Sequence, residues 1–503
     1  MTFRFLHIAD VHLGKHQHQS DARYADYFAV LSSVVEHAVR ARVNGVRVDA
    51  VLIAGDLFDE QDPSAETVRR AMAALRPLRA AGIPAFAIEG NHDRRKRTEP
   101  ACALDILAGE EYLRLLRPDI ADGTLTLRPW TSDSGGGMIR AADGVVIAGL
   151  GFLGHNIEEY HRQAAEQLPA EAFPILLSHV MVQPGEETLE YGCVAYADIA
   201  PLRERIGYLA LGHRHTRVGL DDEMDGWVYN PGSLEFVNTL DYRLPPALRG
   251  FLDVTLSDVP LEDEGTGEEA GGEGTSTEAP SAQRNVERMG YHLRVRHVAT
   301  DKRPAYTLRP DISGCDSPAA VVDAVRRAAQ ELDAAQRARG PILIARLQGT
   351  LALSRSRLPR AAITAMLQEE FGALHVEVMD RDLLGGTDVG TLLADSEDLE
   401  QLTDRARAVA ADLLRGGGIA VGRESDLATT LIDMKTQLQG GTKNPSKEVL
   451  RGLREQLLPY VEYDEEETRE ASADDDADEG DTDRDDGSGA APNLRRRDPL
   501  RPP

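Results

Sequence analysis

Residues 3–13 read FRFLHIADVHL, an apolar run that passes directly into two polar residues, Asp10 and His12. Its length and composition predict a buried strand, and side chains two positions apart on a strand point to the same side. More strand-like runs and helical stretches alternate further along: strands at 50–54 and 84–88, helices at 23–43 and 65–81. This alternation predicts an α/β fold.

A polar cluster follows each of five strand-like runs. In chain order the clusters are Asp10-Val11-His12, Gly55-Asp56-Leu57-Phe58-Asp59, Gly90-Asn91-His92-Asp93, Ser178-His179 and Gly212-His213-Arg214-His215. In α/β folds, sites are built at the carboxyl ends of strands, where these clusters are expected. Any one cluster alone is typical of core or surface residues. All five in order, each at a strand end, argue for a common site.

The residue types in these clusters indicate divalent metal ions. Carboxylates, imidazoles and an amide oxygen suit manganese, iron or zinc, and no thiolate is among them. Two such ions about 3.5–4 Å apart can clamp both the attacking and the leaving oxygen of a displacement at phosphorus. One carboxylate must bridge the two ions, and Asp56 is the natural candidate. The sequence therefore predicts a two-metal phosphoesterase site.

The rest of the first half is richer in strands, which predicts a second sheet packed on the first. The runs are 145–150, 175–178, 208–211 and 227–229, followed by 251–255 and 292–298. The last two frame an acidic stretch, 257–283, with eight Asp or Glu and no Lys or Arg. We interpret this stretch as a disordered expansion of a hairpin tip, and a domain boundary there is the alternative.

A smaller α+β unit is predicted next, followed by helices. Its expected elements are a helix at 317–335, a strand at 342–347, a helix at 359–371 and a strand at 374–379. Residues 396–461 carry helical apolar stripes, which either pack internally or dock on a partner helix. The predicted units are 1–256, an insertion at 257–286, a hairpin end with the small domain at 287–395, the helices at 396–461 and an acidic tail at 462–503.

The charge of −28 is concentrated in two segments. The stretches 257–283 and 462–486 together supply −21 of it, so a basic nucleic-acid surface elsewhere is not excluded. Three cysteines lie far apart, which indicates reduced thiols and an intracellular protein. No signal peptide and no run long enough to span a membrane is evident, so we expect a cytoplasmic, nucleoid-associated location.

The five motifs resemble those of the calcineurin-like metallophosphoesterases, and among them the SbcD-type DNA double-strand-break nucleases. The matching stretches are HIADVHLGK at 7–15, GDLFD at 55–59, IEGNHD at 88–93, LGHRHT at 211–216 and YNPGSLE at 229–235. The resemblance implies a two-sheet sandwich flanked by helices, then a small capping domain and C-terminal helices. It also implies a metal-dependent exonuclease or endonuclease in DNA repair and recombination.

The resemblance assigns two divalent ions, with manganese as the expected metal. One ion would be held by Asp10, His12, Asp56 and His215, and the other by Asp56, Asn91, His179 and His213. His92 would protonate the leaving oxygen or stabilise the transition state, with Asp93 orienting its ring. This chain has Asp59 where some nucleases of this type have His. Exonuclease activity inferred from the resemblance is therefore less secure than metal binding.

The resemblance also implies partners: double-stranded DNA ends, an SbcC-like SMC-family ATPase bound through the C-terminal helices, and a second copy of the chain. Arg94, Arg95, Lys96 and Arg97 follow the third motif and would contact the DNA backbone, with a solvated loop as the alternative. The rival functions are a metallophosphodiesterase or phosphatase for a small molecule or phosphoprotein, and a scaffold with a lapsed site. Intact ligands in all five motifs argue against the scaffold.

Overall fold

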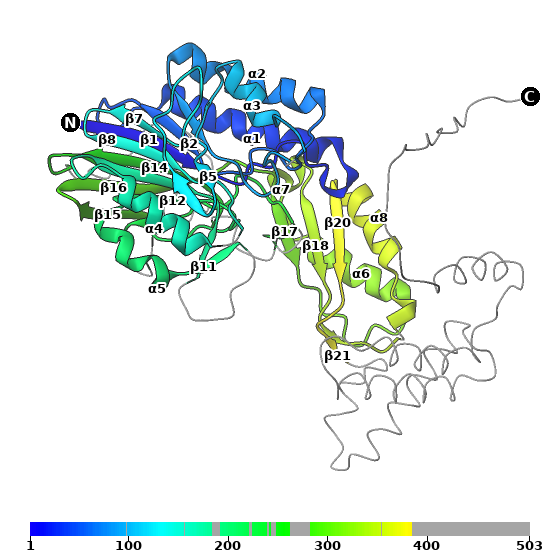
Figure 1. Ribbon diagram of the computed structural model, residues 1–503. Coiled ribbons are helices and arrows are strands. Elements are labelled where there is room, and N and C mark those ends of the chain that lie inside the picture. The colour runs from blue at the N-terminus through cyan, green and yellow to red at the C-terminus, as the bar shows by residue number, and fades with distance from the viewer. Residues whose placement is uncertain are drawn as a thin grey trace, which may run out of the picture. The chain divides into compact units, whose positions relative to one another are not determined.

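The computed structural model describes residues 1–384, apart from residues 97, 155, 184–191, 221–223, 239–240, 243–247, 262–281 and 354. Its first part contains two sheets that pack face to face (Figure 1). The first sheet has the order β15-β16-β14-β1-β2-β3-β4. Its strands are β1 (Thr2–Ile8), β2 (Ala50–Ile53), β3 (Ala85–Ala87), β4 (Arg114–Leu115), β14 (Gly250–Ser257), β15 (Gln283–Arg288) and β16 (Tyr291–Ala299).

The second sheet has the order β13-β12-β9-β8-β7. Its strands are β7 (Met138–Ala142), β8 (Val145–Gly149), β9 (Phe173–Ser178), β12 (Tyr208–Leu211) and β13 (Val228–Tyr229). In each sheet the strands that precede the motifs are parallel: β1, β2 and β3 in the first, β9 and β12 in the second. Parallel neighbours end at the same edge, so each sheet brings its motifs together at one edge.

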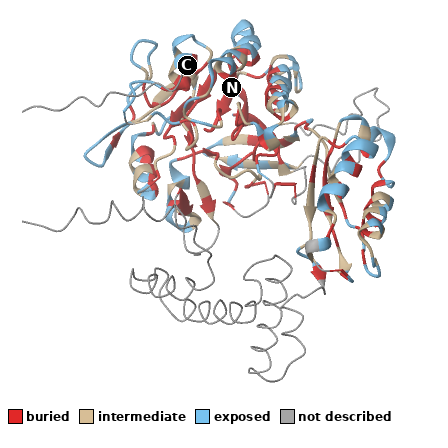
Figure 2. Cartoon of the chain, turned by 90° about the vertical axis from the view of Figure 1, so that its right-hand side faces the viewer, coloured by how far each residue is buried: buried red, intermediate tan, exposed pale blue. Residues whose placement is uncertain are grey.

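Alternating side chains of β1 explain the layering. Phe3 and Phe5 join the core between the sheets, whereas Leu6 and Ile8 pack against the helices that cover the outer face. Each such side chain, fully buried, stabilises the fold by about 1.5–3 kcal/mol. Strands buried on both faces read as continuous apolar runs, which is why these were visible in the sequence. Figure 2 shows the buried residues gathered in the strands.

Helices cover both outer faces of the sandwich. The helices are α1 (Asp21–Arg40), α2 (Ala65–Ala81) and α3 (Ala103–Gly109) on the first sheet, with α4 (Ile157–Gln167) and the short α5 (Tyr196–Ile199) on the second. Ser20 caps α1 by accepting the backbone N–H of Arg23. Gly82 ends α2 with a left-handed φ of 67°, a conformation that glycine adopts without strain. Short pairs complete this part: β5 (Asp119–Ala121) with β6 (Thr124–Thr126), and β10 (Met181–Gln183) with β11 (Cys193–Ala195).

The strand β15 was not predicted. It occupies Gln283–Arg288, part of which was assigned to the disordered insertion 257–286, and Ser257 belongs to β14. The predicted neighbours β14 and β16 do pair antiparallel, but the acidic stretch leads into β15, which pairs with β16 at the sheet edge. Val286 is the one apolar residue of β15, because an edge strand with a wet face needs few apolar side chains.

The small domain is a three-stranded parallel sheet with helices between its strands. Its elements are β17 (Ala305–Leu308), α6 (Pro318–Ala329), α7 (Ala334–Ala338), β18 (Ile342–Arg346), α8 (Arg360–Phe371) and β20 (His375–Met379), with the short pair β19 (Gly349–Thr350) and β21 (Leu383–Leu384). We predicted an α+β unit, but parallel strands joined by helices make it α/β. The helix expected at 317–335 ends at Ala329, because Asp333 and Gln336 form a capping box that starts α7.

The predicted helices at 396–461 and the predicted tail at 462–503 lie outside the described residues. Across the described residues, no helix combines the length and apolarity that crossing a bilayer needs.

Candidate metal centre

The chain turns sharply where it leaves the strands. Asp10 and His12 both have a φ of 52°, Asp56 has 51° and His213 has 76°. Such values are uncommon for residues other than glycine, and they cluster at functional sites. We predicted that Asp10 and His12 share a side because they lie on a strand, but β1 ends at Ile8. Left-handed turns, rather than the strand pleat, direct these side chains to one place.

At two motif glycines, neighbouring atoms lie so close to the backbone that there is no room for a side chain. A Cβ atom at Gly90 would overlap Oδ1 of Asp56. A Cβ atom at Gly212 would overlap the carbonyl of Ala54 and lie 2.7 Å from Nδ1 of His179. The backbone at both positions therefore forms the wall against which candidate ligands pack.

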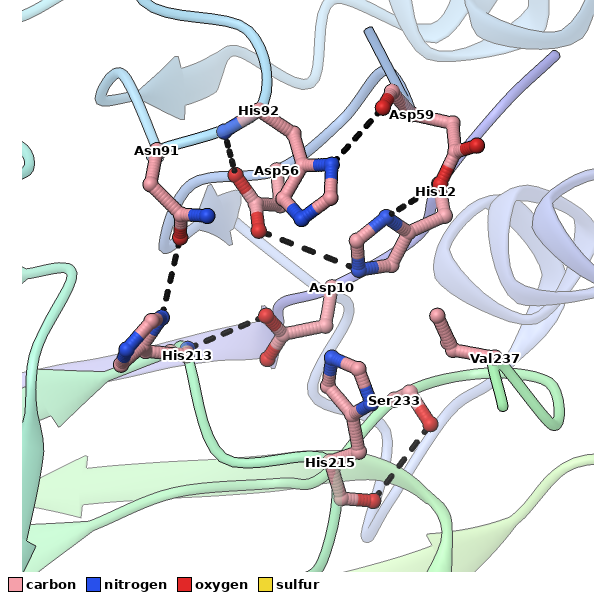
Figure 3. Close-up of polar contacts among 12 residues, drawn as sticks. Asp10, His12, Asp56, Asp59, Asn91, His92, His213, His215, Ser233 and Val237 are labelled. Carbon is pink, nitrogen blue, oxygen red and sulfur yellow. Dashed lines mark hydrogen bonds and ion pairs between the residues drawn. The ribbon is translucent and has the colours of Figure 1, made fainter. Parts of the chain in front are cut away.

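Asp10, His12 and His215 form a first group of donor atoms that lie within 4.8 Å of one another (Figure 3). Oδ1 of Asp10 accepts the backbone N–H of His213 at 3.0 Å. Oδ2 of Asp10 and Nε2 of His12 are buried and have no hydrogen-bond partner among the described residues. Buried polar atoms are nearly always paired, so two such atoms facing one space fit a bound cation.

Asp56, Asn91, His179 and His213 form a second group. Oδ1 of Asn91 lies 3.0 Å from Nε2 of His179 and 2.9 Å from Nδ1 of His213. Nδ1 of His179 lies 2.8 Å from the carbonyl of Ala54, to which it donates, so in the neutral ring Nε2 presents its lone pair to the group. When both rings are neutral and their facing nitrogens carry lone pairs, these nitrogens and the amide oxygen suit a cation placed between them.

Asp56, a member of the second group, also faces the first group, and its role as a bridging carboxylate stays a prediction. Its Oδ2 lies 3.2 Å from Nε2 of His179 and 3.8 Å from Nε2 of His12. Burial lowers the pKa of His179, but the charge of Asp56 outweighs it and raises this pKa to about 9. Burial also acts to raise the pKa of Asp56, yet His179 and His12 hold it well below its usual value. The centre of the site therefore favours positive charge.

The ring of His92 is oriented by a residue we did not predict. Its Nδ1 lies 2.7 Å from the backbone carbonyl of Asp59 (Figure 3). We predicted that Asp93 plays this role, and that prediction is wrong. The Asp93 carboxylate accepts the backbone N–H groups of Gly90, Leu57 and Phe58 at 2.7, 2.7 and 3.2 Å. Asp93 therefore ties the third motif to the second, and burial with the charge of Asp56 raises its pKa to about 7.

Three further residues support the ligands in roles that were not predicted, although two of them lie in quoted motifs. The Asp59 side chain accepts a hydrogen bond from Nδ1 of His12 at 3.0 Å and from Lys15 at 2.9 Å. Asn230 of the NPGS stretch donates to the carbonyl of Gly212 at 3.1 Å, which fixes the last motif. Asp241 lies 3.8 Å from Nδ1 of His215 and carries no sequence signal that could have identified it.

The described residues of the predicted basic run differ in their contacts, and DNA binding by this run stays a prediction. Arg94 lies over the ring of Phe152, with its Cζ 5.5 Å from the ring centroid. Lys96 forms an ion pair with Asp62. The backbone N–H of Arg95 donates to Glu89 at 2.9 Å. Arg97 lies outside the described residues.

Comparison with known proteins agrees with this geometry. Residues 3–217 match the family model of the calcineurin-like phosphoesterases. This part of the chain is therefore a calcineurin-like phosphoesterase domain, as its motifs predicted.

The similarity extends to individual proteins, each named "DNA double-strand break repair protein Mre11". The chain is 29% identical over 259 residues to the protein of Methanosarcina mazei, covering 52% of this chain and 37% of the relative. It is 30% identical over 216 residues to that of Sulfurisphaera tokodaii, covering 42% and 49%. Over 94 residues it is 42% identical to that of Archaeoglobus fulgidus, covering 19% and 20%. The chain thus spans about half or less of the length of these relatives.

Proposed function

We propose that this chain is a divalent-metal-dependent nuclease that processes DNA ends in double-strand-break repair. The observation that carries the proposal is the position of Asp56, whose Oδ2 faces both His12 and His179, one from each group of donor atoms. A carboxylate shared by two groups suits a pair of ions, and such pairs serve displacement at phosphorus. The names of the similar archaeal proteins support DNA as the substrate.

The ligand sets follow from the two groups. Asp10, His12, Asp56 and His215 would hold one ion, and Asp56, Asn91, His179 and His213 the other, with manganese as the proposed metal. The orphaned buried atoms of Asp10 and His12 fit this assignment. When bound, the ions would supply Lewis-acid activation and neutralise charge on the phosphate.

His92 is the proposed proton donor. Donation from Nδ1 to the carbonyl of Asp59 fixes the ring and leaves Nε2 to carry the mobile proton. In the doubly protonated form, Nε2–H can be given to the leaving oxygen or can stabilise its charge. The backbone N–H of His92 donates to Oδ1 of Asp56 at 2.9 Å, so the residue is held against the bridging carboxylate.

The proposed partners are DNA ends, an SbcC-like SMC-family ATPase and a second copy of the chain. The ATPase would bind the apolar stripes at 396–461, and the homodimer would form through helices of the phosphoesterase domain. A small-molecule phosphodiesterase or phosphatase would need neither the small domain nor those stripes.

The test is digestion of end-labelled linear duplex DNA with manganese by wild type, His92→Ala and Asp56→Ala. We expect manganese-dependent degradation by the wild type and its loss in both variants. If the wild type hydrolyses a generic phosphodiester but cleaves no DNA, the assignment of the metal site stands and the substrate is a small molecule.

A further inference from the structure

Arg94 and Phe152 form a pair beside the second group of donor atoms. The Arg94 guanidinium lies over the ring of Phe152, and this ring lies 5.6 Å from the ring of His213 and 6.1 Å from that of His179. Within the described residues no ion pair or hydrogen bond joins Arg94 to any candidate ligand. The cation is therefore next to the metal centre without being part of it.

Glu89 holds the two segments of this pair together. Its carboxylate accepts the backbone N–H of Arg95 at 2.9 Å, and its backbone carbonyl accepts the N–H of Phe152 at 2.9 Å. Arg117 fixes the same carboxylate with donors at 2.8 and 3.1 Å. Because Glu89 bonds to both segments, their backbones are held side by side, with Arg94 and Phe152 close enough for the ring contact.

The neighbouring cations of the run have other contacts. Lys96 is paired with Asp62, and the Arg95 guanidinium donates to the carbonyl of Pro100 at 3.3 Å. Arg94 is exposed, and a guanidinium over an aromatic face keeps its in-plane N–H groups for a ligand. Those groups form a planar fork that matches a phosphate.

We propose that Arg94 binds a phosphate adjacent to the scissile one, and that Phe152 is the positioning residue that holds its guanidinium there. This inference rests on the proposed nuclease function. It adds that the site distinguishes a polynucleotide from a small diester, because a substrate with a single phosphate has none for Arg94 to contact.

The experiment compares two substrates with wild type, Arg94→Ala and Arg94→Lys in manganese. One is a DNA oligonucleotide, and the other is the p-nitrophenyl ester of thymidine 5′-monophosphate, which has a single phosphate. For Arg94→Ala we expect kcat/KM on the oligonucleotide to fall about tenfold or more, the usual effect of one charged hydrogen bond. The ester should be hydrolysed at the wild-type rate, and Arg94→Lys should recover part of the loss. Arg162→Ala, an exposed ion-paired arginine on α4, is the control.

The positioning role of Phe152 is tested by comparing its variant alone and in combination with Arg94→Ala. Phe152→Leu removes the aromatic face but keeps an apolar side chain, and it should lower kcat/KM on the oligonucleotide with unchanged manganese affinity. Combined with Arg94→Ala it should add nothing, since the ring acts through the guanidinium. An additive loss would show that Phe152 contacts the substrate itself and would overturn its positioning role.

The outcomes separate this inference from the proposed function. If the wild type cleaves DNA, three results would overturn the inference alone. Arg94→Ala could cleave DNA as fast as the wild type, or it could lose the same factor of kcat/KM on both substrates. The third result is that Arg95→Ala loses as much activity on DNA as Arg94→Ala does. A wild-type protein that hydrolyses the ester but no oligonucleotide would overturn the proposed function, and this inference with it.

Discussion

The Asp59 carboxylate accepts a hydrogen bond from Nδ1 of His12 at 3.0 Å, while Nε2 of the same ring faces Asp56 at 3.8 Å. A carboxylate on one nitrogen fixes the ring and its tautomer, so that the other nitrogen is ready to bind a cation. Lys15 donates to the same oxygen at 2.9 Å, which keeps Asp59 in place.

Asp59→Ala should therefore weaken metal binding without unfolding the protein. We expect manganese affinity to fall by roughly 10–100-fold, the usual effect of losing such a support. Titration of manganese monitored by electron paramagnetic resonance measures this loss. Glu60→Ala, an exposed acid one residue along, controls for the change in charge. Equal affinities for wild type and Asp59→Ala would show that the ring needs no support.

Gly90→Ala should abolish activity, because its Cβ would overlap Oδ1 of Asp56. We expect nuclease activity to fall by more than about 100-fold, since displacing the shared carboxylate by even 1 Å disturbs both groups. Gly109→Ala is the matched control: a Cβ there meets nothing within 4 Å, so activity and stability should be retained. Activity of Gly90→Ala close to the wild-type level would contradict the assigned position of Asp56.

The site residues could be predicted from sequence because each motif follows an apolar run that is buried on both sides. Asp10, Asp56 and His213 stand at such strand ends, and all three lie in the centre. Their convergence could not be derived from strand geometry. It depends on left-handed turns, which local sequence pattern does not reveal for residues other than glycine.

The supporting contacts were harder to predict, since they join residues that sequence spacing does not relate. We assigned Asp93 to His92 because the two are neighbours, yet its side chain bonds to Leu57 and Phe58 of another motif. The carbonyl that orients His92 belongs to the backbone of Asp59. Every residue has such a carbonyl, so the sequence does not show which one accepts this hydrogen bond. The strand β15 escaped notice for a related reason: an edge strand lacks the apolar alternation that marks a buried one.

The raised pKa of His179 predicts that metal binding is coupled to the release of a proton from this ring. With a pKa of about 9 in the folded protein against an ordinary 6.5, His179 is charged at pH 7 when no metal is bound. A metal ion needs the neutral ring, so binding must release this proton. Apparent manganese affinity should rise with pH up to about 9. Calorimetry in buffers of different ionisation enthalpy counts the protons released, and a count near zero at pH 7 would contradict the prediction.

The same shift determines how stability depends on pH after removal of metal with a chelator. Because the folded pKa is raised, the contribution of His179 is present in full below pH 6.5 and is lost as pH rises through about 9. One pKa unit corresponds to about 1.4 kcal/mol, so the loss is on the order of 3 kcal/mol. Urea unfolding between pH 6 and 9.5 measures it. His179→Asn should show a smaller slope over this range.

His92→Ala should separate chemistry from metal binding. The ring is held by the carbonyl of Asp59, and its removal leaves the donor atoms of Asp10, Asn91 and His179 in place. General acid catalysis contributes about 10²–10⁴-fold, so kcat should fall within that range while manganese content stays at the wild-type level. The loss should be smaller on a p-nitrophenyl ester than on DNA, because p-nitrophenolate leaves without needing a proton. Equal losses on the two substrates would assign His92 to stabilising phosphate charge and would exclude it as the proton donor.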